Sequence, residues 1–360
     1  MYSIYFVKYY DVFGGFIMKN TCAIVLAAGE GTRMKSNMPK VLSKVLFRPL
    51  LKWVLNALNT AEISNVCIVT GYKNEIVTDY LNTLNIKYKT VVQKERKGTA
   101  HAVLTAKEFL FENIDSDVLI LNGDSPFIDY DTIKSAFDLH KSQKNAATVI
   151  SAKIKNPYGY GRIIRASHTG TLTAIVEQKD ADEKTQKINE VNSGAYWFNI
   201  RSLLEVLHNI KNNNAQSEFY LPDAISLLLS RGFNVNAYIS QSENTVLGAN
   251  NPIQLNELNN IARLNILKKL MLNGVDIPCV NGIIISDEVK IGQNTCILPG
   301  TIITGKTIIG TNCTIGPNTH IDNCLVGNNI SLRSVDCTNS RFISESYIKP
   351  FSVINNDKFV

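Results

Sequence analysis

The chain has 360 residues, of which 45% are hydrophobic and 19% are charged, so it is long enough for two domains that each have a core. This composition excludes a disordered chain, and no run of 18 apolar residues is present that could cross a membrane as a helix. The formal charge of +6 is modest and includes no block of five or more basic residues, which gives no support for nucleic acid binding. A charge of this size suits small phosphorylated substrates.

The cysteines and the first residues indicate a cytoplasmic protein. The seven cysteines form no Cys-x-x-Cys pair and their number is odd, which predicts reduced, mostly buried thiols. Residues 1–17 have no basic segment and no small-residue cleavage site, so they do not read as a signal peptide. We treat them as an N-terminal extension that precedes the first strand.

Residues 18–248 alternate apolar runs with helical patterns, which predicts an α/β domain with a largely parallel sheet. In such sheets, ligands bind at the carboxyl ends of the strands. We therefore expect the loops that follow the strands to carry the functional side chains. The expected strands are residues 22–27, 66–71, 91–92, 118–122 and 147–152.

The loop after the first expected strand combines glycines with two cations. Gly29 and Gly31 allow a tight turn with N–H groups free for phosphate oxygens. Arg33 and Lys40 would neutralise charge on a departing pyrophosphate. Neither the Walker A sequence nor the dinucleotide G-x-G-x-x-G pattern is present. The loop therefore predicts a cradle for a nucleoside triphosphate.

Two further loops follow expected strands. Asn122-Gly123-Asp124 puts a carboxylate at a strand end, which suits Mg²⁺, although an aspartate there is also a common helix cap. Gln93 follows the strand at 91–92, and its amide can accept a hydrogen bond from uracil N3–H and donate one to O4. Because an amide can flip, Gln93 alone does not exclude cytosine.

The last third of the chain has two other periods. Apolar residues recur at spacings of three to five between positions 252 and 273, which predicts a long amphipathic helix. Isoleucines then recur every six residues, which is typical of a parallel β-helix with its isoleucines facing inward. The helical residues are Ile253, Leu258, Ile261, Leu264, Leu267, Leu270 and Met271, and the repeat residues are Ile285, Ile291, Ile297, Ile303, Ile309, Ile315 and Ile321.

The segment L-A-A-G-E-G-T-R-M with P-K-V-L resembles the signature of the sugar-1-phosphate nucleotidyltransferases. Over residues 19–351 the chain is similar to the bacterial bifunctional N-acetylglucosamine-1-phosphate uridyltransferase / glucosamine-1-phosphate acetyltransferase family. The resemblance implies an N-terminal extension (1–17), a Rossmann-like nucleotidyltransferase domain (18–248), a connecting helix (249–274) and a short left-handed β-helix (275–360). It also implies UTP and N-acetylglucosamine 1-phosphate as substrates, Mg²⁺ as cofactor, a role in cell wall precursor synthesis, and a homo-oligomer, for which the β-helix offers a trimer.

The resemblance also implies roles for individual residues. Asp124 becomes the metal ligand, and Asn250 supplies a second oxygen. The run from Gln93 to Ala102 resembles the uracil-reading loop, although Arg96 and Lys97 replace an expected Gln-Leu pair. The residues implied at the nucleotide are Leu26, Ala27, Ala28, Gly29, Lys40, Gln93, Gly98, Thr99, Asn122 and Gly123, and those implied at the sugar are Gly161, Glu177, Asn192, Tyr220 and Asn250.

The resemblance stops in the acetyltransferase half. Residues 348–351 match a family segment, but Asn355 stands where an arginine of the acetyl-transfer site is expected. We therefore expect uridylyl transfer without acetyl transfer. Because a sugar phosphate is already anionic, its attack on the α-phosphorus needs no general base. The five histidines, among them His101, are thus expected to be structural or surface residues.

Three alternatives remain open. One is the same reaction with another nucleotide or sugar, such as dTTP with glucose 1-phosphate. Another is a non-catalytic nucleotide-sugar sensor, although Arg33, Lys40, Asp124 and Asn250 together favour an enzyme. The third, a β-helix acyltransferase, is disfavoured by the small number of coils.

Overall fold

The computed structural model describes residues 18–86, 88–343 and 348–359, and these form two compact units. The first unit comprises residues up to Ser43 and from Pro49 to Asn251. The second comprises residues 44–48 and everything from Pro252 onward. The expected N-terminal extension, 1–17, lies outside the described residues.

The first unit is built on one sheet of nine strands, seven of which follow the order β11-β7-β10-β6-β1-β4-β5. A hairpin of β8 and β9 extends from β10. The strands are β1 (Thr21–Ala27), β4 (Val66–Thr70), β5 (Lys89–Val92), β6 (Asp117–Asn122), β7 (Ala147–Lys153), β8 (Arg162–Arg165), β9 (Leu172–Val176), β10 (Glu190–Asn199) and β11 (Val235–Ile239). The helices are α1 (Leu50–Thr60), α2 (Asn74–Asn82), α3 (Thr99–Thr105), α4 (Lys107–Glu112), α5 (Tyr130–Ser142), α6 (Glu183–Gln186), α7 (Ile200–Leu207) and α8 (Pro222–Ser230), with single turns at Thr32–Met34, Lys40–Leu42 and Glu243–Val246.

The predicted α/β fold with a largely parallel sheet is confirmed. All five expected strands are present, and β1 pairs in parallel with both β4 and β6. The sequence analysis did not predict β10, which runs antiparallel between β6 and β7. A bulge lies between Asn192 and Ala195. It interrupts the alternation of side chains by which a strand is recognised in a sequence.

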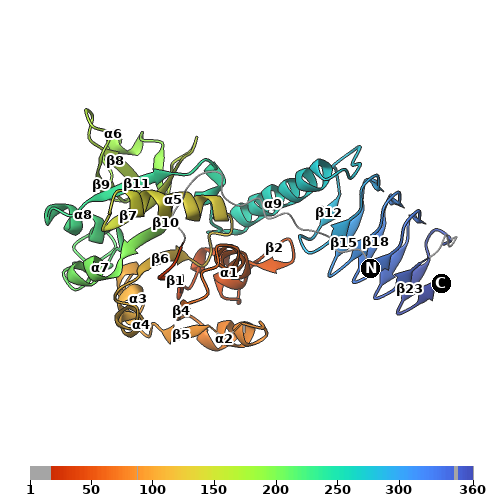
Figure 1. Ribbon diagram of the computed structural model, residues 1–360, viewed down its shortest axis with the longest axis horizontal. Helices are drawn as coiled ribbons and strands as arrows, with labels where there is room; N and C mark the ends of the chain where they lie inside the picture. Colours follow the sequence, from red (N-terminus) through yellow and green to blue (C-terminus); the bar gives the residue numbers. More distant parts are fainter. Residues whose placement is uncertain (1–17, 87, 344–347, 360) are drawn as a thin grey trace. The chain divides into compact units, whose positions relative to one another are not determined.

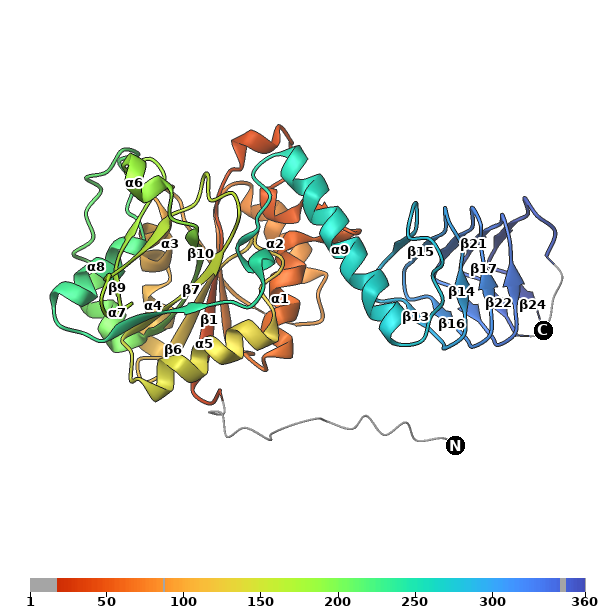
Figure 2. The same cartoon turned by 90° about the horizontal axis from the view of Figure 1, so that it is seen from above.

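Helices cover both faces of this sheet (Figure 2). Side chains alternate along β1, so that Cys22 and Ile24 pack with α3, α4, α7 and α8. Ala23 and Val25 point the other way and pack with α1, α2 and α5. Because both faces are buried, β1 reads as a continuous apolar run rather than as an alternating one.

The topology brings four loops to one edge of the sheet. The ends of β1, β5 and β6 lie at the carboxyl edge because these strands are parallel. Since β10 runs the opposite way, its first residues reach the same edge, where Gly194 approaches Asn122. The edge on which the sequence analysis placed the functional loops therefore also receives Asn192.

The second unit contains a long helix and a parallel β-helix (Figure 1). The predicted helix is confirmed as α9 (Pro252–Leu272). Its predicted apolar stripe is partly wrong, because Leu258, Leu267 and Leu270 are buried but Ile253 and Leu264 are 73% and 46% exposed. The remaining strands are β2 (Lys44–Val45), β3 (Arg48–Pro49), β12 (Ile284–Ile285), β13 (Lys290–Ile291), β14 (Cys296–Ile297), β15 (Ile302–Thr304), β16 (Ile308–Ile309), β17 (Thr314–Ile315), β18 (His320–Asp322), β19 (Leu325–Val326), β20 (Ser331–Leu332), β21 (Asp336–Thr338), β22 (Arg341–Phe342), β23 (Val353–Asn355) and β24 (Lys358–Phe359).

The six-residue repeat forms the three walls of a left-handed β-helix. Ile285, Ile303 and Ile321 pair in register on one wall and are fully buried. After Ile321 the strict period ends, but the coil continues with Val326 and Leu332 in the inward positions. The isoleucine period alone does not extend past Ile321, because the spacing there shortens and isoleucine is replaced, whereas the family resemblance implies a β-helix over residues 275–360.

Ile303→Ala should destabilise the second unit by about 2–5 kcal/mol, because it opens a cavity between two buried isoleucines. Lys306→Ala is the control, since Lys306 lies in the same coil and is exposed. Scanning calorimetry of the full chain would measure both variants. Equal loss of thermal stability in the two variants would contradict the inward placement of Ile303.

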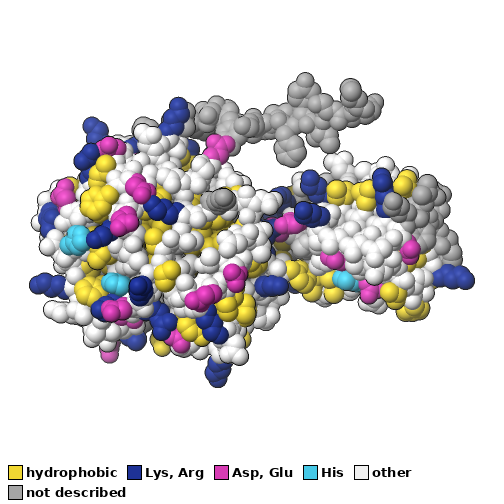
Figure 3. Space-filling model, turned by 90° about the horizontal axis from the view of Figure 1, so that it is seen from below, with side chains coloured by type: hydrophobic (Ala, Val, Ile, Leu, Met, Phe, Trp, Pro, Cys, Tyr) yellow, Lys and Arg dark blue, Asp and Glu magenta, His cyan; other side chains and the backbone are white. Residues whose placement is uncertain are grey.

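Charge and hydropathy of the described residues agree with the composition. On the face drawn in Figure 3, basic and acidic side chains are interspersed instead of forming one field of a single sign. None of the helices in the described ranges combines the length and the hydropathy that a bilayer-crossing segment needs.

Candidate active site

Two cavities open at the carboxyl edge of the sheet in the first unit, and they share a wall. We call them the loop cavity, which is lined by Gly29, Arg33 and Gln93, and the strand cavity, which is lined by Glu177 and Asn192. The shared wall consists of Leu26, Thr99, Asn122, Asp124 and Glu218. A molecule bound in one cavity would therefore meet a molecule bound in the other beside Asp124.

Most residues singled out in the sequence line one of these cavities. Ala27 and Gly123 are the exceptions: Ala27 packs in the core beneath the sheet, and the Gly123 N–H donates to the carbonyl of Leu26 at 2.8 Å. The predicted residues in the loop cavity are Leu26, Ala28, Gly29, Arg33, Lys40, Gln93, Gly98, Thr99, Asn122 and Asp124. Those in the strand cavity are Leu26, Thr99, Asn122, Asp124, Gly161, Glu177, Asn192, Tyr220 and Asn250.

Lys40 joins residues that are far apart in the sequence. Its Nζ forms an ion pair with Asp124 and donates to Asn250 Oδ1 at 2.9 Å. Arg33 Nη2 donates to the same oxygen at 3.2 Å. Gly31 makes room for this arrangement, because its φ is +66° and a Cβ there would lie 2.6 Å from Cβ of Lys40. The loop after β1 thus holds both cations beside the shared wall.

The residues around Lys40 fit a divalent cation. Asp124 and Asn250 offer one carboxylate and one amide oxygen, which are hard donors, and both already converge on a single cationic group. Within the described residues, no group of three or more His, Cys, Asp or Glu side chains could hold a metal. A cation bound here would therefore take its other ligands from water and phosphate oxygens, as Mg²⁺ commonly does.

Gln93 sits in the wall of the loop cavity and is only 4% exposed. Its backbone N–H donates to the carbonyl of Thr70 at 2.8 Å, which continues the pairing of β5 with β4. Its Nε2 lies 3.2 Å from the Gly98 carbonyl and 2.9 Å from His101 Nδ1. Both amide hydrogens are used within the protein when the His101 ring carries its proton on Nε2. The expected donation from Gln93 to uracil O4 is not available in this arrangement, and only Oε1 remains for a ligand.

Gly98 lies where the segment before α3 crosses the segment before α8. The segment around it pairs with the chain before α8: the Phe219 N–H donates to the Lys97 carbonyl at 2.8 Å, and the Ala100 N–H donates to the Phe219 carbonyl at 2.9 Å. Gly98 has φ +109°, and a Cβ on it would lie 2.5 Å from O and 2.8 Å from N of Phe219. Only glycine fits this close backbone crossing.

Gly98→Ala should therefore both destabilise the first unit by a few kcal/mol and reduce nucleotide affinity. The new methyl group meets backbone atoms, which cannot rotate away as a side chain could. Thermal unfolding with and without nucleotide measures both effects. Gly170→Ala is the matched control, because Gly170 also has a positive φ but has nothing within 4 Å of an added Cβ. Similar losses in the two variants would show that backbone strain, not the crossing, is responsible.

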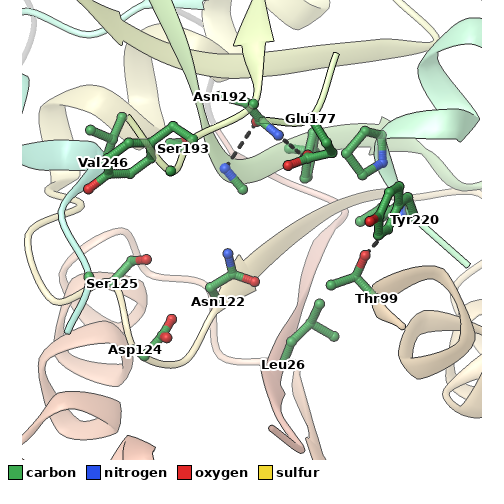
Figure 4. Close-up of a pocket in the computed structure, with 18 of the residues that line it drawn as sticks. Leu26, Thr99, Asn122, Asp124, Ser125, Glu177, Asn192, Ser193, Tyr220 and Val246 are labelled. Atoms are coloured by element: carbon green, nitrogen blue, oxygen red, sulfur yellow. Dashed lines mark hydrogen bonds between the residues drawn. The ribbon is translucent and has the colours of Figure 1, made fainter. Parts of the chain in front are cut away.

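The strand cavity brings polar groups from β10 and the β8–β9 hairpin toward Asn122 and Asp124 (Figure 4). Asn192 is fixed on both sides, because its Nδ2 donates to the Tyr196 hydroxyl at 2.6 Å and its Oδ1 accepts from the Gly194 N–H at 3.0 Å. The bulge in β10 creates this second contact. The side chain of Asn192 is thus held in place before any ligand arrives.

Two side chains of the strand cavity, Glu177 and Tyr220, have raised pKa values. Burial raises the pKa of Glu177, and the carboxylates of Asp180 and Asp223 raise it further. Burial also raises the pKa of Tyr220 to about 12, and its hydroxyl donates to Gln216 at 2.7 Å. Gly161 allows close approach here, since a Cβ on it would lie 2.9 Å from Glu177 Oε1. This side of the cavity offers the Glu177 carboxyl group, whose pKa is raised, and the Tyr220 ring to a ligand.

Several cavity residues were missed from sequence. Ser125 and Val246 line the strand cavity and carry no motif signal of their own. Arg96, noted as a departure from the family pattern, lines the loop cavity, where its Nη2 pairs with Glu30 at 3.0 Å and its guanidinium lies 5.6 Å from the centre of the Tyr72 ring. The residue that departs from the family pattern therefore lies in the wall of the loop cavity.

Comparisons with known proteins find relatives that cover both units of the chain. Residues 22–244 match the family described as "Nucleotidyl transferase", and residues 288–323 match "Bacterial transferase hexapeptide (six repeats)". A relative named "Bifunctional protein GlmU" from Caldanaerobacter subterraneus subsp. tengcongensis is 40% identical over 343 residues, which cover 94% of this chain and 74% of the relative. The relative of the same name from Geobacillus sp. is 41% identical over 332 residues, 92% of this chain and 71% of the relative.

One solved structure shows the same fold at low sequence identity. Its name proposes a glucose-1-phosphate thymidylyltransferase from Bacillus anthracis in complex with a sucrose. It is 20% identical with a TM-score of 0.56, covering 68% of this chain and 95% of that one. The family predicted from the glycine loop and the repeat is confirmed. The protein belongs to the nucleotidyl transferase family, and within it to the GlmU family, and is a sugar-1-phosphate nucleotidyltransferase.

Proposed function

We propose that this enzyme transfers a uridylyl group from UTP to N-acetylglucosamine 1-phosphate and releases pyrophosphate, with Mg²⁺ as its metal. The observation that carries the proposal is the shared wall of the two cavities. A nucleotide in the loop cavity and a sugar phosphate in the strand cavity would bring their phosphates together beside Asp124 and Lys40.

The reaction needs no covalent intermediate. An anionic phosphate oxygen of the sugar phosphate attacks the α-phosphorus of UTP and forms a new P–O bond. The bond from the α-phosphorus to the oxygen that bridges to the β-phosphate breaks, and pyrophosphate takes that electron pair. No proton has to be removed from the nucleophile, so positioning and charge neutralisation account for the catalysis.

The cations of the glycine loop would stabilise the leaving group. Gly29 and Gly31 line the loop cavity, where their backbone N–H groups would bind phosphate oxygens, and Arg33 and Lys40 would offset the charge on pyrophosphate. Asp124 and Asn250 would hold the metal. A bound Mg²⁺ supplies charge neutralisation at the phosphate oxygens and holds them in a fixed geometry.

The choice of substrates rests on the walls of the two cavities. Gln93 presents an acceptor to the base, which suits the N3–H of uracil. In the strand cavity, Asn192 and Glu177 would bind sugar hydroxyls and the acetamido group, and the ring of Tyr220 would cover its methyl group. The rival pair, dTTP with glucose 1-phosphate, has the support of a fold likeness only.

Two further parts of the proposal concern the β-helix. Asn355 provides no positive charge where the resemblance implies an arginine, so we propose that acetyl transfer is absent. Ile308 and Leu325 are 44% and 37% exposed on neighbouring coils of one wall, which supports self-association through this unit. Light scattering measures the oligomeric state directly.

The first experiment measures pyrophosphate release with UTP, N-acetylglucosamine 1-phosphate and Mg²⁺. The expected result is release that needs UTP and the acetylated sugar and stops with a chelator. Faster release with dTTP and glucose 1-phosphate would overturn the choice of substrates. Thermal stabilisation by UDP-N-acetylglucosamine without release in any combination would favour the sensor. Acetyl transfer from acetyl-coenzyme A to glucosamine 1-phosphate, assayed in parallel, would contradict the single activity.

A further inference from the structure

His101 makes a contact in the wall of the loop cavity that the transfer chemistry does not require. It lies in the first turn of α3, half-buried, with Nδ1 2.9 Å from Nε2 of Gln93. The carbonyl of Gly98 lies 3.2 Å from the same Nε2. Because Gln93 is 4% exposed, water competes little for these two contacts.

The two partners determine which way the amide of Gln93 faces. A backbone carbonyl only accepts, so the group facing Gly98 must be the NH₂. The second hydrogen of that NH₂ is donated to His101 Nδ1, which accepts when the ring proton is on Nε2. A flipped amide would set its oxygen against the Gly98 carbonyl and against Nδ1. Buried acceptors facing one another without a hydrogen between them are costly.

The fixed amide presents one kind of group to the cavity. Within the described residues no hydrogen bond to Gln93 Oε1 is present, and Gln93 lines the loop cavity. A base that reaches this side chain therefore meets an acceptor and no available N–H. A base docked with N3 toward Oε1 is accepted as uracil, which offers N3–H, and repelled as cytosine, which has a lone pair at N3. Without His101, the amide could turn and present its NH₂ to cytosine instead.

We propose that His101 is the positioning residue for base selection: it holds Gln93 with its oxygen toward the cavity and so sets the preference for UTP over CTP. The inference rests on the proposed uridylyl transfer and names the residue behind its choice of base. The sequence analysis gave this histidine only a structural or surface role. It transfers no proton and acts on the nucleotide through Gln93.

The test compares kcat/KM for UTP with that for CTP, using N-acetylglucosamine 1-phosphate and Mg²⁺. His101→Leu keeps apolar bulk and helix propensity but has no acceptor, and should lower the UTP-to-CTP ratio by about tenfold or more. His101→Asn can place its Oδ1 near the position of Nδ1 and should restore most of the ratio. In a Gln93→Leu background, His101→Leu should change the ratio no further, since no amide remains to be oriented.

An unchanged ratio in His101→Leu overturns the proposal, and so does an equal loss in the Leu and Asn variants, because a structural role would not separate them. A wild-type enzyme that prefers CTP also overturns it. Dissociation constants for UTP and CTP without sugar phosphate keep the test independent of turnover. If no sugar phosphate is converted, the proposed function fails, while the ratio of the two dissociation constants still tests His101.

Discussion

Asp124→Ala should lower kcat/KM for nucleotidyl transfer by about 10³-fold, which corresponds to roughly 4 kcal/mol of transition-state stabilisation. The wall that the two cavities share carries two carboxylates, Asp124 and Glu218, and Asp124 is the one that forms an ion pair with Lys40. Removing it leaves a metal with one weak amide ligand and phosphate oxygens. Steady-state pyrophosphate release over a range of Mg²⁺ concentrations measures the effect.

The metal dependence separates ligand loss from general damage. Asp124→Asn keeps an oxygen donor without the charge, so its activity should fall less than that of Asp124→Ala and recover in part at high Mg²⁺. Asp131→Ala is the matched control, because Asp131 is exposed in the first turn of α5 and lines neither cavity. Loss of activity in Asp124→Ala with an unchanged Mg²⁺ requirement would show that Asp124 is not a metal ligand.

Lys40→Ala should lower kcat/KM by about 10²–10³-fold through loss of charge neutralisation at the leaving pyrophosphate. Its side chain is only 13% exposed, so its charge is partly shielded from water and interacts more strongly with phosphate oxygens. The same variant should need less Mg²⁺ for half-maximal activity. Lys40 pairs with Asp124 in this structure, and a cation competes with Lys40 for that carboxylate.

Opposite shifts in the Mg²⁺ requirement are therefore expected for Lys40→Ala and Asp124→Ala. Inhibition by added pyrophosphate should weaken in Lys40→Ala as well, because pyrophosphate then has one positively charged side chain fewer to bind. Lys44→Ala serves as the comparison, since Lys44 is exposed and lines neither cavity. A Lys40→Ala enzyme with normal turnover and normal pyrophosphate inhibition would remove Lys40 from the catalytic machinery.

The strands and the repeat were predictable because their signals are local. The apolar run at β1 predicted a strand of a largely parallel sheet, and the isoleucine period predicted the β-helix from Ile285 to Ile321. The tight turn at Gly31 was also predictable, because a backbone with positive φ favours glycine whatever the rest of the fold. These features depend on neighbours within a few residues, which a sequence displays directly.

Other features depend on contacts across the chain. The sequence did not predict β10, because its bulge is held by contacts across the chain, including the hydrogen bond that the Ser193 hydroxyl donates to the Ile150 carbonyl. It suggested that Gln93 both accepts from and donates to a base, since an isolated amide can do either. The carbonyl of Gly98 and the ring of His101 use the donor, and only folding brings them together.

The sequence by itself thus determined the fold class, the glycine loop with its cations and the repeat, because strand burial, backbone freedom and a six-residue period are properties of short segments. Only the tertiary structure decided how the two cavities meet at Asp124, why Asn250 lies beside Lys40, and which way Gln93 faces. These depend on the antiparallel β10 and on backbone crossings such as that of Gly98 with Phe219. Hydrogen-bond partners in other segments, from Gly98 beside Gln93 to Asn250 beside Lys40, select one orientation among several that a short segment allows.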